Sequence, residues 1–481
     1  MKRHLRFLVA VLAATAALVI TAQWLGQLTA AGQSPSSAAS RPKYIFIFLA
    51  DGGGIPHMEI TRLYNRQIYN QGMTIPDKIM KEGALGLFTT HAADSLSTDS
   101  AAAATALASG CKAKIGMLGI CADGTAGKTA MEIAHEKGMR IGLVTTATVY
   151  DASPAGFVTH VGNRKNFGAI VDGYLKLTPD LLLGGGRDQF LPQTQPGSQR
   201  KDDRDVIQEF AKKGYRYASN RDELERIKEG KVLGLFGVKD LSFELDRNSK
   251  REPSLYEMTQ ATIRLLSENN SRGFVAFVEN ENVDTAGHWT DVASVIHAYR
   301  EFDRAVGLAY EFYQKHPRET LILVTSDHET GGLGFTLALK DLSNTSGGNQ
   351  KAATMADFKR IESISISLKK AGEILGPHPT SAAVDNLMKG YFKGFTLAPD
   401  IREAILKQQP FSRTLYVDVT ANALGMMVAN NTQAYWLTSS HTNHPVFAAA
   451  LGVGAEKFRG YHDNTDFGKM LKAIIDGESR R

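Results

Sequence analysis

Cysteine is scarce in this chain, which has only two among its 481 residues. Cys111 and Cys121 do not form a CxxC pair, so the sequence offers no basis for a metal site built from thiolates. In an oxidising compartment the two could instead pair and close a short loop. No cysteine lies near the N-terminal apolar run, which leaves a lipid-anchored form without an acceptor residue there.

Runs of lysine and arginine interleaved with aromatic residues are also absent, which argues against nucleic acid as a specific partner. The formal charge is +5, but three of those charges belong to Lys2, Arg3 and Arg6. A chain cut after Ala22 would carry about +2, so the mature surface is less basic than the whole sequence. The chain shows no internal repeat, and its length suits one large domain or two modest ones.

The N-terminus has the residue order of a secretory signal. Basic residues precede an apolar run over residues 7–20, and small residues follow it. We expect residues 1–22 to be a signal peptide, with cleavage after Ala22 or Ala30, and residues 23–42 to be a polar linker. A retained membrane anchor is the alternative, because the run is close to the lower length limit for a span. The mature protein is then periplasmic or extracellular, with no stable membrane span.

After the linker, short β-branched runs alternate with helical patterns. Apolar runs without strict polar alternation, separated by helices, are typical of an α/β fold with a mainly parallel sheet covered on both faces. Strands are expected at residues 44–49, 141–145, 181–183, 274–278, 321–324 and 446–451. Helices are expected at residues 129–137, 255–268 and 292–314.

One segment, at about residues 340–433, departs from this alternation. It opens with the turn-rich sequence SNTSGGN, shows helical spacing of apolar residues over 361–371, and has Pro399 at an expected helix start. We interpret it as a helical insertion on the sheet. It could form a lid, a dimer contact or a substrate-specificity element.

The stretch SLSTDSAAAATALASG contains a candidate nucleophile, Ser100. The small residues after it favour a helix, and Ser97, Thr98, Asp99 and Ser100 are all residue types that cap helices. A helix is therefore expected to begin close to Ser100, where free N–H groups and the helix dipole favour an anion. Its hydroxyl could attack a phosphorus atom held there. The alternative is an ordinary cap on an alanine-rich core helix.

Carboxylates and histidines follow three of the expected strands. Because the carboxyl ends of parallel strands lie at one edge of a sheet, these side chains should gather at a ligand site. Mixed Asp/His sets suit Zn²⁺ and oxygen-rich sets suit Mg²⁺, and the number of groups exceeds the need of one ion. Taken singly, each could cap a turn or a helix instead. The set is Asp51, Glu279, Asp284, His288, Asp327 and His328, with His441 and His444 before the last strand.

The stretch DASPAGFVTHVGNRK adds two further groups. Ser153 offers a neutral oxygen suited to Mg²⁺, and the guanidinium of Arg164 matches two phosphate oxygens. Asp99, beside Ser100, could orient that guanidinium. An ordinary surface arginine is the alternative.

Together these motifs resemble the alkaline phosphatase family. The matching pieces are ADGGG, TDSAAAATA, DASPAGFVTHVGNRK, LGGGR, VEN with VDTAGH, VTSDHETGG and SSHT, in the family's order across nearly the whole mature chain. The resemblance implies one catalytic domain over residues 43–481, a central mainly parallel sheet sandwiched by helices, and usually a homodimer. It implies hydrolysis of phosphate monoesters through a phosphoserine at Ser100, with Arg164 holding the phosphate.

The resemblance also implies two Zn²⁺ and one Mg²⁺. Its positions assign Asp284, His288 and His441 to the first zinc, and Asp51, Asp327 and His328 to the second. Magnesium would be held by Asp51, Ser153 and Glu279, with Asp151 as a supporting residue beside them, while Asp99 would support Arg164.

The chain departs from the family pattern at two threonines. Many members have Lys, His or Trp at the position of Thr285, and some have His at the position of Thr330, so Thr285 bears on phosphate affinity and on metal preference at the third site. Two other classes of function stay open: a related phosphodiesterase or sulfatase, and a non-catalytic phosphate- or metal-binding protein of the envelope. An acyl hydrolase with a Ser-His-Asp triad is disfavoured, because no GxSxG motif surrounds Ser100.

Overall fold

Ten strands form the main sheet of the computed structural model, which describes residues 41–339 and 350–477. The strand order is β16-β2-β15-β8-β1-β7-β3-β4-β6-β5. Strand β15 is antiparallel to β2 and β8, and the other pairs of this sheet are parallel, which confirms the predicted α/β class. The strands are β1 (Tyr44–Ala50), β2 (Ala84–Phe88), β3 (Arg140–Thr148), β4 (Leu181–Gly185), β5 (Tyr215–Ala218), β6 (Lys231–Leu235), β7 (Phe274–Asn280), β8 (Thr320–Thr325), β15 (Val446–Gly452) and β16 (Gly460–His462).

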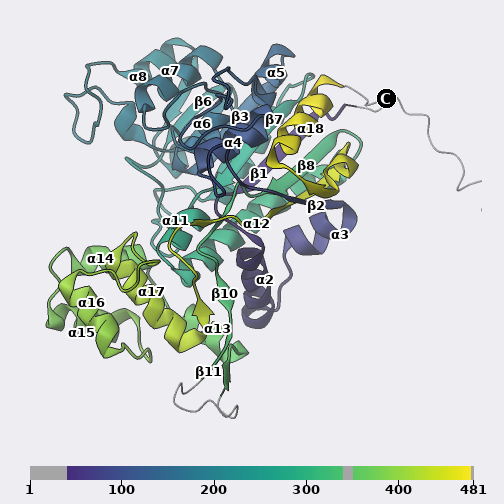
Figure 1. Ribbon diagram of the computed structural model, residues 1–481. Helices are drawn as coiled ribbons and strands as arrows, with labels where there is room; N and C mark the ends of the chain where they lie inside the picture. The colour runs from purple at the N-terminus through teal and green to yellow at the C-terminus, as the bar shows by residue number, and fades with distance from the viewer. Residues whose placement is uncertain (1–40, 340–349, 478–481) are drawn as a thin grey trace, which may run out of the picture. The chain divides into compact units, whose positions relative to one another are not determined.

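Helices cover both faces of this sheet (Figure 1). On one face, Ile45, Ile47 and Leu49 of β1 join a hydrophobic cluster that includes α4 (Ser100–Ser109), α5 (Ala130–Glu136), α7 (Phe167–Leu177), α8 (Val206–Lys212) and α18 (Asn464–Asp476). On the other face, Phe46 and Phe48 join a cluster with α10 (Leu255–Ser267) and α12 (Val292–Lys315). Every residue of β1 is buried, which explains its continuous apolar sequence.

The six predicted strands and three predicted helices are all present, with ends that differ by up to three residues. The sequence did not predict β2, β5, β6 and β16, which lie toward the two edges of the sheet. Gly86 and Gly234 interrupt β2 and β6, and alternate residues of β2 are exposed. These short strands therefore lack the apolar run that marks the buried centre of the sheet.

The segment after β8 is mainly helical over residues 355–432, but the helical spacing expected over 361–371 is divided between one helix that ends at Glu362 and another that begins at Leu368. The helices of this segment pack with α2 (Ile55–Tyr69) and the start of α12 in a third hydrophobic cluster, and Pro399 begins α16 as predicted. The helices are α13 (Met355–Glu362), α14 (Leu368–Leu375), α15 (Ser381–Tyr391), α16 (Pro399–Lys407) and α17 (Val419–Thr432). That this segment is an insertion stays a prediction, and its SNTSGGN opening lies outside the described residues.

Shorter elements connect these layers. They are α3 (Met80–Glu82), α6 (Ala152–Gly156), α9 (Arg221–Arg226) and α11 (Asn282–His288), with the pairs β9 (Glu329–Thr330) and β14 (His441–Thr442), β10 (Gly334–Phe335) and β13 (Ala434–Tyr435), and β11 (Leu337–Leu339) and β12 (Gln350–Ala352). The proposed signal peptide, and the linker up to residue 40, lie outside the described residues. Within residues 41–339 and 350–477, no helix has both the length and the apolar character needed to cross a bilayer.

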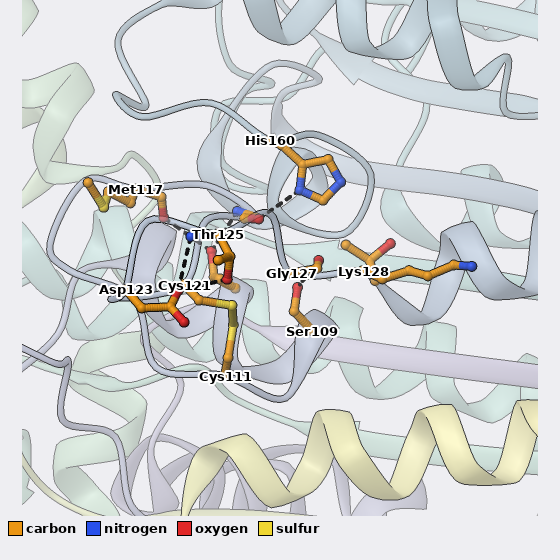
Figure 2. Close-up of a disulfide and its surroundings, with 12 residues drawn as sticks. Ser109, Cys111, Met117, Cys121, Asp123, Thr125, Gly127, Lys128 and His160 are labelled. Carbon is orange, nitrogen blue, oxygen red and sulfur yellow. Dashed lines mark hydrogen bonds between the residues drawn. A yellow bond between two sulfur atoms is a disulfide. The ribbon is translucent and has the colours of Figure 1, made fainter.

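A disulfide joins Cys111 to Cys121 in the loop that follows α4 (Figure 2). The sequence left this pairing open, and the structure shows that it is formed. Replacing both cysteines by serine is expected to lower the free energy of unfolding by about 2 to 3 kcal/mol, because the closed loop restricts the unfolded chain. Thermal unfolding of the metal-loaded double variant measures the effect. Each single serine variant should lose as much, and a double variant as stable as the parent would contradict the prediction.

His297 on α12 should make the free energy of unfolding depend on pH. Burial, together with the charge of Arg300, lowers the pKa of His297 to about 4. Between pH 6.5 and pH 4 the unfolded chain therefore binds a proton that the folded chain does not, so stability falls as the pH falls through this window. At pH 5 the loss is about 1 to 2 kcal/mol relative to pH 7. His297→Gln should remove that part of the difference in urea unfolding, and an unchanged pH dependence would show the prediction to be wrong.

Candidate active site

Ser100 is the first residue of α4, as the sequence predicts. Asp99 caps the helix, because its Oδ1 accepts a hydrogen bond from the Ala102 N–H at 3.0 Å. The hydroxyl of Ser100 is therefore not used as a cap, and its Oγ lies 3.3 Å from Nε2 of His328. The side chain is largely buried at 5% exposure. This geometry disfavours the reading of Ser100 as an ordinary capping residue.

Strands β8, β1 and β7 are neighbours, so their carboxyl ends bring the predicted acidic residues together. Asp51 follows β1, and its Oδ1 lies 3.4 Å from Nε2 of His328. Asp327 follows β8, and its Oδ2 lies 3.2 Å from the same nitrogen. These three side chains form one group whose ligand atoms are close enough to share a metal ion. The grouping matches the set that the family resemblance implies for the second zinc.

A second group lies beside the first. His288 Nε2 is 3.1 Å from Asp284 Oδ2 and 3.1 Å from His441 Nε2. The ligand atoms of Asp284, His441 and His328 also lie within reach of one ion, and the rings of His328 and His441 stack at 3.7 Å. The structure thus brings the three expected ligands of the first zinc together and adds His328 to their surroundings.

Backbone carbonyls orient two of these histidines. Nδ1 of His288 lies 2.8 Å from the Ser439 carbonyl oxygen, and Nδ1 of His441 lies 2.8 Å from that of Thr98. Each bond directs the proton to Nδ1 and leaves Nε2 free as a ligand. Sequence reasoning missed these two partners, because a backbone acceptor leaves no signal in residue type.

The third expected set lies on the other side of Asp51. Ser153 Oγ donates to Asp51 Oδ2 at 3.0 Å, while Thr145 Oγ1 donates to Glu279 Oε2 at 2.5 Å. Ser153 and Glu279 are fully buried. Asp51 therefore faces His328 with one oxygen and Ser153 with the other, and it can belong to two ion sites.

The electrostatics of these carboxylates call for a cation. Burial, and the charge of Asp327, raise the pKa of Asp51 well above its usual range. Burial, and the charge of Asp51, do the same to the pKa of Glu279, while the pKa of Asp327 is raised by burial and Asp284. Among the described residues, Asp51 Oδ1, Asp327 Oδ2 and Glu279 Oε1 are buried atoms without a hydrogen-bond partner. A bound cation would satisfy these oxygens, so the donor set fits metal ions.

Arg164 lies between two carboxylates. Its Nη1 donates to Asp99 Oδ2 at 3.2 Å, and its Nη2 donates to Asp151 Oδ1 at 3.0 Å. Asp99 therefore orients the guanidinium as expected, and it also caps the helix that begins with Ser100. Asp151 bonds to Arg164 and its charge raises the pKa of Glu279, so it links the arginine to the third set.

The two unusual threonines have different partners. Thr285 Oγ1 donates to Glu281, a residue outside the predicted ligand sets, so its bond does not join it to the groups around His328. Thr330 Oγ1 donates to Asp284 and lies 3.3 Å from Nδ1 of His328, which places it in contact with two expected ligands. His444, the other histidine before β15, faces Glu329 and not the candidate ion sites.

Comparisons with known proteins agree with this geometry. A family model described as alkaline phosphatase matches residues 42–476. Alkaline phosphatase 3 of Bacillus subtilis (strain 168) is 30% identical over 462 residues, covering 92% of this chain and 93% of the relative. The repressible alkaline phosphatase of Saccharomyces cerevisiae is 30% identical over 481 residues, covering 92% of this chain and 82% of the relative. The crystal structure of Thermus thermophilus alkaline phosphatase superposes with a TM-score of 0.80 at 27% identity, covering 92% and 93% of the two chains. With its fold, its clusters of candidate metal ligands and these matches over nearly the whole described chain, this protein belongs to the alkaline phosphatase family.

Proposed function

We propose that this chain is an exported phosphomonoesterase that works through a covalent phosphoserine on Ser100. The observation that carries the proposal is the position of the Ser100 hydroxyl, at the start of α4 and 3.3 Å from Nε2 of His328. His328 belongs to both candidate metal groups. The serine hydroxyl thus lies beside the histidine that the two groups share, and the start of its helix is a site for a phosphoryl group.

We assign the ligands to three ions. Asp284, His288 and His441 would hold one Zn²⁺, Asp51, Asp327 and His328 a second, and Asp51, Ser153 and Glu279 one Mg²⁺. Nitrogen-containing sets suit zinc and the all-oxygen set suits magnesium, which supports this division. Bound cations of this kind lower the pKa of an attacking hydroxyl and stabilise charge on the phosphoryl and leaving oxygens.

The chain's own groups bind and orient the phosphoryl group. Ser100 Oγ attacks phosphorus, the new O–P bond forms as the ester bond breaks, and the alcohol leaves. The free N–H groups of the first turn of α4 and the guanidinium of Arg164 donate to the phosphoryl oxygens. Asp99 and Asp151 hold that guanidinium in place. Water then cleaves the phosphoserine, releases inorganic phosphate and restores Ser100.

A phosphodiesterase or sulfatase would use similar metals, but Arg164 favours monoesters. Two adjacent N–H donors of a guanidinium bind two unsubstituted phosphoryl oxygens, and a phosphate monoester keeps a third for the metal ions, whereas a diester has only two in all. A sulfate ester has three such oxygens but carries less negative charge for the guanidinium and the cations to bind. We expect kcat/KM for an aryl phosphate monoester at alkaline pH to exceed that for the matching diester and sulfate by at least about a hundredfold. The rate should vanish after chelation and return with Zn²⁺ and Mg²⁺. Faster diester or sulfate turnover would reverse the assignment, and no turnover by the metal-loaded protein would favour a binding protein.

The site of action and the assembly state are part of the same proposal. The Cys111–Cys121 disulfide supports an oxidising compartment, as does the signal-like order of residues 1–22. N-terminal sequencing of the protein recovered outside the cytoplasm tests cleavage after Ala22 or Ala30. Light scattering of the purified protein tests the expected homodimer.

A further inference from the structure

The loop closed by the disulfide is bonded directly to the residues around Arg164. The Gly116 N–H donates to Asp99 Oδ2 at 3.1 Å, and the same oxygen accepts from Nη1 of Arg164. The Gly116 carbonyl oxygen accepts from the backbone N–H of Arg164 at 2.8 Å. The peptide groups of one glycine therefore link Asp99 to both the main chain and the side chain of Arg164.

Two further contacts join this loop to the segment that leads to Arg164. Leu118 and Val161 exchange backbone hydrogen bonds of 2.9 and 2.8 Å. His160, whose ring is bonded to this loop in Figure 2, has Nδ1 2.7 Å from the Gly119 carbonyl oxygen. Its Nε2 lies 2.9 Å from Oε1 of Glu132. The segment before Arg164 is thus held at successive positions by the disulfide loop.

The loop is also bonded to α4, the helix of Ser100. The Gly119 N–H donates to Thr105 Oγ1 at 2.9 Å, and Thr105 Oγ1 lies 3.1 Å from the Met117 carbonyl oxygen. Cys111 comes directly after Gly110, the residue that caps the C-terminus of α4. The loop therefore lies between the helix that carries the nucleophile and the segment that carries the arginine.

Regular secondary structure does not fix the conformation of this loop. Residues 111–121 form no helix, and their strand contacts are the isolated bridges at Leu118 and Ile120. The Cys111–Cys121 bond joins the two ends of the segment. Without it, the loop would keep its hydrogen bonds, including those from Lys112 to Asn464 and from the Ile115 N–H to Asp94, but it would sample more conformations.

We propose that Cys111, Cys121 and Gly116 are positioning residues for phosphate binding: the disulfide-closed loop 111–121 holds Arg164 and Asp99 in the arrangement that a phosphate group requires. This inference rests on the proposed role of Arg164 in holding phosphate. A disulfide persists in an oxidising compartment and not in the cytosol. Full phosphate affinity is then a property of the exported form of the protein.

Two variants test the proposal without thiol reagents, which would also bind the metal ions. Cys111→Ser/Cys121→Ser opens the loop. Gly116→Ala strains it, because Gly116 has a φ of +81°, although its Cβ would meet no atom within 4 Å. In both metal-loaded variants the Kd for inorganic phosphate, measured by calorimetry, and KM for an aryl phosphate should rise roughly tenfold, while kcat changes less than about twofold.

Gly124→Ala is the matched control. Gly124 also has a left-handed φ, of +88°, and open space at its Cβ position, but it lies outside the disulfide loop and donates to the Cys121 carbonyl oxygen. We expect its Kd for phosphate to match that of the parent. A rise equal to that of Gly116→Ala would mean that any strain in this region weakens phosphate binding, and the proposal would be overturned.

The dependence on Arg164 is tested in an Arg164→Ala background. There the Gly116→Ala change should raise the Kd for phosphate less than about twofold, because the group through which it acts is gone. An unchanged Kd in Gly116→Ala alone, or an equal rise with and without Arg164, would overturn the proposal.

The glycine variant keeps the test decisive if the double serine variant does not fold. If the parent binds phosphate but hydrolyses no monoester, the proposed function fails, and the calorimetric comparison still decides the role of the loop.

Discussion

Ser100→Ala is expected to lower kcat for an aryl phosphate monoester by at least about a thousandfold, because it removes the proposed nucleophile. The fold and the ligands should be preserved. Asp99, not Ser100, caps α4, and the Ser100 hydroxyl has only His328 as a hydrogen-bonding neighbour among the described residues. Metal content and melting temperature should therefore stay close to those of the parent. Steady-state rates of the metal-loaded variant measure the effect.

Ser97→Ala is the matched control for this experiment. Ser97 precedes the same helix, and its hydroxyl contacts Ser95 instead of a metal ligand. Its kcat should stay within about twofold of the parent, as for most surface changes away from a site.

Acid quenching of the parent during turnover should trap phosphate on the peptide that contains Ser100. Rapid turnover by Ser100→Ala, or phosphate trapped on another residue, would reject the phosphoserine mechanism.

Asp51→Asn is expected to lower activity by at least about a hundredfold and to reduce the content of both Zn²⁺ and Mg²⁺. Asp51 lies between His328 and Ser153, so it is assigned to two ion sites. Asparagine has nearly the same size but supplies no negative charge. Elemental analysis of the purified variant, together with kcat at increasing metal concentration, measures the effect.

Stability of the metal-free protein distinguishes a ligand from a merely structural carboxylate. Because burial and Asp327 raise the pKa of Asp51, its ionised form destabilises the folded state at pH values above the pKa of the unfolded chain. The metal-free Asp51→Asn variant should therefore melt at a higher temperature than the metal-free parent at pH 8. With saturating metal the order should reverse, because the parent binds the ions more tightly.

Asp123→Asn provides the control, since Asp123 is an exposed carboxylate that bonds to Thr125. Neither its metal content nor its activity should change. If Asp51→Asn keeps its full metal content, the assignment of Asp51 to the ion sites is wrong. A lower melting temperature of the metal-free variant would point instead to a structural role.

Local sequence was sufficient for the parts of the site that depend on neighbouring residues. The start of a helix at Ser100 follows from cap residues and an alanine run, and both lie within one turn. The buried strands that precede Asp51 and Asp327 follow from unbroken apolar runs. The edge strand β16 and its neighbour β2 were missed, because short strands with exposed residues lack the continuous apolar run that distinguishes a buried strand from a loop.

What the sequence by itself determined was the fold class, the position of the proposed nucleophile at a helix start and the set of candidate ligands, because strand and helix signals are local and ligand residues are recognisable by type. The tertiary structure decided which ligands face one another, since Asp284, His328 and His441 come from separate elements. It also decided that Cys111 pairs with Cys121, and that Gly116 joins Asp99 to Arg164. These contacts depend on how β8, β1 and β7 align and on how α4 packs beside the loop. Contacts between residues of separate elements form only when the whole chain has folded, so residue type and local spacing do not predict them.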